Sequence, residues 1–174
     1  MAEHISPRGT IGLLVLRDNR QPLGKDAVKW AVDALVDGYD VPSIRTLAGL
    51  DLDGWPNSFE VEGLVETALG ELGVPQTDRH SRAREYVREV ASAIVAKTIA
   101  PQEGANRIHQ RVISPLHHPK DLQGWCCLWE GNAADCSRAL EDSEIDHEII
   151  AYATVFLQAA AQPAVAADGA SPRR

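Results

Sequence analysis

The sequence predicts an all-α protein, arranged as a single array of five or six helices. Over several stretches, apolar residues recur three and four positions apart, the spacing that places them on one face of a helix. Glycine and proline stand at the ends of these stretches, where helices commonly stop or begin. Only residues 11–16 form a strand-like run, and no clear hairpin partner follows to satisfy the backbone groups of a strand.

Length and composition indicate one globular domain. The chain has 174 residues, of which 44% are hydrophobic and 24% charged. A chain of this length buries enough surface to need neither a metal nor a disulfide for its core. We expect a flexible leader at residues 1–9, a helical domain at 10–162 and a disordered tail at 163–174, which is rich in Ala, Pro, Gly and Ser.

The first half of the chain divides into four segments. Residues 11–16 (IGLLVL) predict a short helix or an extended arm packed on the core. Residues 26–37 carry an apolar face, and Gly38 can end that helix. Pro42 can open a short helix that ends at Leu47 or Leu50. Residues 57–72 are the best-marked helix, with an apolar stripe of Val61, Leu64, Val65, Ala68, Leu69 and Leu72.

The second half contains three further helices and one irregular stretch. Residues 79–99 predict a long helix, and Pro101 suits the first turn of the next one. Residues 119–140 are less regular. The last helix begins at Ser143, where Asp146 stands at the capping-box spacing.

Residues 49–60 (GLDLDGWPNSFE) partly match a calcium-binding loop between two helices. Asp51, Asp53 and Glu60 fall where such a loop places oxygen ligands, but a glycine occupies its first ligand position. Asn57 and Glu60 also have the spacing of a helix-capping box, which would commit Glu60 to the start of the helix. We therefore favour a helix start here and keep these three acids as calcium candidates.

Soft metal ligands gather between residues 117 and 136. They are His117, His118, Cys126, Cys127 and Cys136. Zinc accepts such groups, but structural zinc sites use cysteine pairs two to four residues apart, and adjacent cysteines point in different directions. A buried, inert cysteine is the simpler interpretation, and the set remains a metal-site candidate. We expect no cofactor.

The sequence leaves open the roles of two tryptophans and one histidine. Trp125 and Trp129 are four residues apart and share a helical face, so they either pack in the core or anchor a partner. His109 lies beside an apolar stripe and is either a half-buried structural histidine or a base or ligand.

Charge limits the range of partners. The formal net charge is −8, which opposes binding to nucleic acid and to anionic lipid. A basic stretch at residues 79–111 is diluted by glutamates and is expected to form a solvated helix face with local ion pairs. Residues 40–78 hold eight acids and one arginine, so an acidic surface could select a basic partner protein.

Three stretches of the chain resemble a group of small bacterial all-helical proteins of unknown function. They are DGYDVPSIRTLAGL (37–50), EVEGLVETALGELGVP (60–75) and AIVAKTIAPQEGANRIHQ (93–110). The resemblance implies a helical fold and supplies no functional residue.

Taken together, these observations predict a non-catalytic, soluble, cytoplasmic interaction or regulatory protein that presents an acidic face to a protein partner. No nucleotide-binding glycine motif, zinc-protease motif or nucleophile elbow occurs in the chain. The odd number of cysteines suits reduced thiols, and no apolar run near the start is long enough for a membrane span. The alternative is a metal-binding enzyme or sensor that uses residues 117–136. The sequence predicts no oligomeric state.

Overall fold

Helices are the regular secondary structure of the described part of the chain. The computed structural model describes residues 6–51, 58–126, 128 and 142–161, and no strand occurs among them. The elements are α1 (Thr10–Asp18), α2 (Gly24–Val36), α3 (Pro42–Ala48), α4 (Ser58–Glu71), α5 (Arg79–Val95), α6 (Pro101–Ile108), the π-helical turn η1 (His109–Ile113), the 3₁₀ turn η2 (Lys120–Leu122) and α8 (Asp142–Ala161). The all-α prediction is confirmed, whereas the expected five or six helices are too few. Residues 1–5, residues 52–57 of the calcium-loop segment and the C-terminal tail lie outside the described residues.

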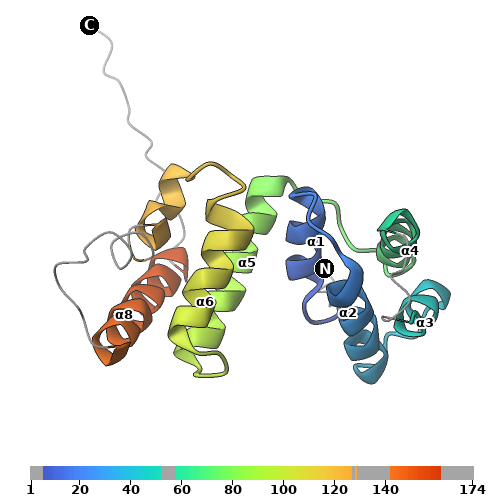
Figure 1. The fold of residues 1–174 in the computed structure, drawn as a ribbon, viewed down its shortest axis with the longest axis horizontal. Coiled ribbons are helices and arrows are strands. Elements are labelled where there is room, and N and C mark those ends of the chain that lie inside the picture. The colour runs from blue at the N-terminus through green and yellow to red at the C-terminus, as the bar shows by residue number, and fades with distance from the viewer. Residues whose placement is uncertain (1–5, 52–57, 127, 129–141, 162–174) are drawn as a thin grey trace, which may run out of the picture.

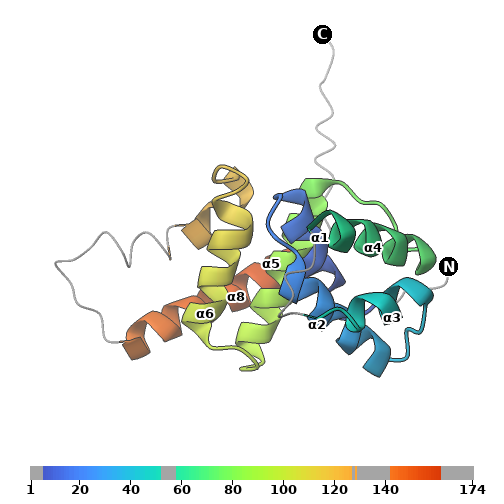
Figure 2. The ribbon, with the colours of Figure 1, turned by 45° about the vertical axis from the view of Figure 1, so that its right-hand side comes forward.

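The strand-like run at residues 11–16 belongs to helix α1, so the extended arm is wrong and the short helix is right. Four consecutive apolar side chains of α1 are buried: Leu13, Leu14, Val15 and Leu16. Helix α1 lies between the other helices (Figures 1 and 2), so neighbours cover it on more than one side. A helix buried in this way shows no polar face, and over six residues its pattern cannot be distinguished from that of a buried strand.

Helix α5 ends four residues earlier than the sequence predicts. Lys97 adopts a left-handed backbone conformation with φ of 58°, and this ends the helix although the residue is not glycine. Two backbone N–H groups close the turn: Lys97 donates to Ile94 and Thr98 to Ala93. At the other end, the Asp78 carboxylate accepts hydrogen bonds from the N–H groups of His80 and Ser81, each at 3.0 Å.

Buried apolar side chains form two clusters that meet at α1, rather than one continuous core. One cluster draws on α1, α2, α3 and α4, and the other on α5, α6, η1, residues 122–126 and α8. Figure 1 shows α5, α6 and α8 on one side of α1, and α2, α3 and α4 on the other. We call these sets the N-terminal and C-terminal halves, with α1 in the first. Val15 of α1 is buried in the cluster of the C-terminal half, while its neighbours face the other.

Ion pairs and hydrogen bonds of the basic stretch join the two halves. Arg82 of α5 donates from Nε to Asp18 of α1 at 2.7 Å, and both side chains are nearly buried. Arg111 pairs with Asp26 of α2 at 3.1 Å, and Arg79 donates to Asn19 at 2.6 Å. The prediction of local ion pairs is therefore wrong for these arginines, because their partners lie far away in sequence. The prediction of a solvated face is wrong for Arg82, whereas Arg79 is exposed.

Gly104 allows α6 to lie very close to α5. A Cβ atom at this position would lie 2.5 Å from Cγ1 of Ile94, so a larger residue would require the Ile94 side chain or the two helices to shift. The chain then continues from α6 into the π-helical turn, where the N–H of Ser114 donates to the carbonyl of His109 at 2.9 Å. This close approach places Arg107 and Arg111 above α5, where they face α2 across a cleft.

Candidate functional site

The structure brings two of the five predicted soft ligands together. Nδ1 of His118 lies 3.0 Å from Sγ of Cys126, whose residue is buried. The His109 ring is half-buried and lies 6.4 Å from the His118 ring, centroid to centroid. His117 and His118 both have left-handed backbone conformations, with φ of 54° and 58°. Cys127 and Cys136 lie outside the described residues.

These groups do not complete a metal site within the described residues. There, no three His, Cys, Asp or Glu side chains are grouped closely enough to hold a metal ion. Of the calcium candidates, Asp51 and Glu60 are exposed, the latter on α4, while Asp53 lies outside the described residues.

Trp125 packs in the core of the C-terminal half. Its residue is 1% exposed, and its indole makes edge-to-face contacts with Tyr152 and Phe156 of α8 at 5.0 and 5.8 Å. This position leaves no indole surface for a partner in the present conformation. Trp129 lies outside the described residues.

Helix α4 carries four glutamates and no cationic residue. Two of them are engaged: Glu66 accepts from Arg17 at 2.8 Å, and Glu71 accepts from the N–H of Ser43 at 3.1 Å. Glu60 and Glu62 are exposed, and neither forms an ion pair with another residue that the structure describes. Phe59 beside them is 84% exposed. We call the surface formed by Phe59, Glu60, Glu62 and Glu66 the acidic face.

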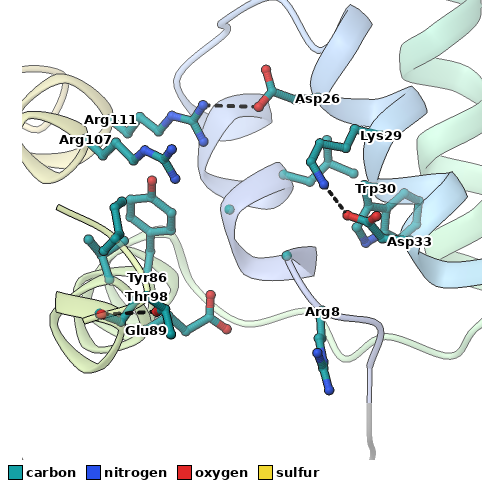
Figure 3. Close-up of a pocket in the computed structure, with 16 residues that line it drawn as sticks. Arg8, Asp26, Lys29, Trp30, Asp33, Tyr86, Glu89, Thr98, Arg107 and Arg111 are labelled. Atoms are coloured by element: carbon teal, nitrogen blue, oxygen red, sulfur yellow. Dashed lines mark hydrogen bonds and ion pairs between the residues drawn. The ribbon is translucent and has the colours of Figure 1, made fainter. Parts of the chain in front are cut away.

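A cleft of about 390 Å³ lies between the two halves. One wall consists of α2 and the start of α1, and the other of α5, α6 and η1 (Figure 3). Four cationic side chains line it (Arg8, Lys29, Arg107 and Arg111), together with three acidic ones (Asp26, Asp33 and Glu89). The volume lies within the range of small-molecule sites in proteins.

Most charges in the cleft are paired across short distances. Arg111 pairs with Asp26 at 3.1 Å, Lys29 with Asp33 at 2.6 Å, and Arg107 with Glu103 one turn earlier. Glu89 forms no ion pair with any residue in the described part of the chain. Figure 3 shows its carboxylate pointing from α5 toward the opposite wall.

The pKa values of two titratable groups on α5 are both raised. Partial desolvation by the surrounding protein, together with the Glu85 carboxylate one turn earlier, raises the pKa of Glu89 to about 7. Burial also raises the pKa of Tyr86, against the opposing effect of the Arg111 guanidinium. Glu89 remains in contact with solvent, so water screens part of its shift and the consequence for folding stability is small.

The substitution Glu89→Gln is expected to stabilise the protein at about pH 8 and to leave it unchanged at about pH 4.5. A carboxyl group whose pKa is higher in the folded than in the unfolded state favours folding while it is protonated. That contribution is lost as the pH rises from the ordinary value of 4.5 through about 7. The difference in Tm between variant and wild type, measured at both pH values, tests this. Glu144→Gln on α8, another exposed glutamate, should show no such pH dependence, and a variant less stable than wild type at the higher pH would contradict the assignment.

The cleft is the feature that reasoning from the sequence missed. Its charged residues come from four separate segments, and the one local signal was the spacing of Arg107 and Arg111 on a single helical face.

No helix in the described part of the chain is long and apolar enough to cross a membrane. Comparisons with family models, curated proteins and solved structures found no match to this chain.

Proposed function

We propose that this protein is a non-catalytic interaction or regulatory protein that presents the acidic face of α4 to a basic protein partner. The observation that supports this proposal is the uniform charge of α4, which holds four glutamates and no cation. Glu60 and Glu62 have no ion-pair partner among the described residues, so a partner could use their charge without breaking a contact within the chain.

The chemistry of the acidic face suits a partner with both basic and apolar groups. Complementary charge speeds encounter and excludes partners of like charge, more than it adds affinity. Phe59 offers an exposed aromatic ring beside the carboxylates, and aromatic residues supply much of the binding energy at interfaces. Nucleic acid is disfavoured, because its phosphates would meet the same glutamates. The proposal places the protein in the cytoplasm, in keeping with an odd number of cysteines.

Affinity capture with a charge-reversal variant tests the proposal. Immobilised wild-type protein is expected to retain one or more basic proteins from a lysate of the source organism at low salt. The variant Glu60→Lys/Glu62→Lys should lose them. Raising the salt to about 0.15 M or more should weaken retention, since this screens exposed charges beyond about 8 Å.

The matched control reverses two exposed glutamates elsewhere. Glu144→Lys/Glu148→Lys on α8 changes the net charge by the same amount and leaves α4 intact. This control should retain the same proteins as wild type. Equal loss in both variants would show that only net charge matters, and no retained protein at low salt would also contradict the proposal.

A second candidate is a metal-binding enzyme or sensor at the segment that contains His118 and Cys126. The 3.0 Å contact between the imidazole and the thiol favours it, because both groups bind soft transition metals. Elemental analysis of the protein as purified tests this candidate. A stoichiometric metal that is lost in His118→Ala would support it, and protein without bound metal would remove it.

A further inference from the structure

The cleft between the halves is lined by both cationic and acidic side chains. Neither a simple cation nor a simple anion complements both kinds of charge. A simple cation would meet four cationic side chains, Arg8, Lys29, Arg107 and Arg111. A simple anion would meet Glu89, which has no ion-pair partner in the described part of the chain. The pattern therefore favours a ligand that carries both charges.

One end of the cleft is suited to an anionic group. Arg107 and Arg111 lie one turn apart on α6 and η1, and the Tyr86 hydroxyl points toward both guanidinium groups (Figure 3). Each guanidinium uses Nη2 for its carboxylate partner within the protein. A guanidinium has five N–H donors in a planar fork, so both retain donors that can bind a carboxylate in the cleft.

The other end is suited to an ammonium group. Glu89 lies one turn after Tyr86 on α5, and its carboxylate points into the cleft (Figure 3). The like charge of Glu85, one turn earlier on the same helix, disfavours the ionised form of Glu89. A bound ammonium group would offset this repulsion and supply the missing counter-charge.

The two other cationic side chains that line the cleft already have acidic neighbours within the protein. Lys29 is held by Asp33 on its own helix, and Arg8 lies near Asp37 at 3.8 Å with a side chain that is 91% exposed. The lining of the cleft also includes apolar residues, among them Leu13 and Val90. A short apolar chain between the two charged groups of the ligand could contact them.

We propose that this cleft binds a small zwitterion, with its carboxylate at Arg107 and Arg111 and its ammonium group at Glu89. The site is separate from the acidic face on α4, so either assignment can fail without the other. Because Glu89 forms no ion pair within the described part of the chain, the residue carries the specificity for the ammonium group.

Calorimetric titration with three kinds of probe tests the proposal. The probes are straight-chain ω-amino acids of increasing length, the n-alkylamines of the same lengths, and the corresponding n-alkanoates. At about pH 8, where most Glu89 carboxyl groups are ionised, at least one amino acid is expected to bind about tenfold or more tightly than the amine and the alkanoate of equal length. Glu89→Gln and Arg107→Gln should each weaken that binding by about tenfold or more.

Matched controls separate the site from general charge effects. Glu144→Gln on α8 and Arg88→Gln on α5 remove exposed charges outside the cleft lining and should leave the affinity unchanged. An amine that binds as tightly as the amino acid would reduce the site to a cation site, and an alkanoate that does so would reduce it to an anion site. Either result overturns the proposal, as does the absence of binding by every amino acid, or an affinity equal to that of wild type in Glu89→Gln or Arg107→Gln.

Discussion

Replacing Arg82 by methionine is expected to lower the free energy of unfolding by about 3 kcal/mol. The Arg82 side chain is 9% exposed and donates to the carboxylate of Asp18, whose side chain is 12% exposed, at 2.7 Å. It also donates to the carbonyl of Thr77. Methionine keeps much of the packing volume but leaves the nearly buried Asp18 carboxylate with only a distant ion pair among the described residues, to Arg17 at 3.9 Å. A buried charge that loses its close partner is costly. Urea denaturation at neutral pH measures the loss.

Two further variants show whether the buried pair is responsible. Arg84→Met removes an arginine from the same helix whose pair with Asp121 is exposed, and it should cost less than about 1 kcal/mol. Adding Asp18→Leu to Arg82→Met should recover part of the stability, because both buried charges are then gone. An equal loss in Arg84→Met, or no recovery in the double variant, would contradict the role assigned to the pair.

This pair also shows why the sequence could not predict how the halves meet. Asp18 and Arg82 are separated by 64 positions, and nothing in their local surroundings distinguishes them from exposed charges. The sequence placed Arg82 on a solvated face, since a charged residue is rarely buried without a partner. The partner exists only because α1 packs against α5, which is a property of tertiary structure.

Where one face of a helix is buried and the other is exposed, the sequence was sufficient to predict which residues are buried. Helix α4 is the clearest case: Val61, Val65, Ala68 and Leu69 of its predicted stripe are all buried. Helix α1 is the opposite case, because it is covered on several sides and has no polar face to reveal its period.

The pairing of His118 with Cys126 was outside the reach of sequence reasoning for a local reason. Two successive histidines, His117 and His118, adopt left-handed backbone conformations, and the 3₁₀ turn η2 follows them. The chain then comes back so that Cys126 lies beside His118. Left-handed backbone is uncommon for residues other than glycine, although histidine is among those that tolerate it. Spacing rules for metal ligands assume a regular helix, strand or knuckle, so they could not indicate which of the five soft groups would meet.

Replacing Trp125 by alanine is expected to lower the free energy of unfolding by about 3–5 kcal/mol. The residue is 1% exposed, and its ring contacts both Tyr152 and Phe156, so alanine leaves a large cavity beneath α8. The sequence left open whether this tryptophan anchors a partner or fills the core, and the two roles differ in this measurement. An anchor on the surface would lose binding with little change in stability.

A phenylalanine variant and a surface control show whether the loss of stability comes from the buried Trp125 side chain. Trp125→Phe should cost less than the alanine variant, because it fills part of the cavity and removes an indole N–H that has no hydrogen-bond partner among the described residues. Val155→Ala, at a position of α8 that is 61% exposed, should change stability by no more than about 0.5 kcal/mol. Thermal and urea denaturation of the three variants measure these differences. An alanine variant as stable as wild type would mean that Trp125 is not part of the core, and the packing of α8 against residues 122–126 would then have to be revised.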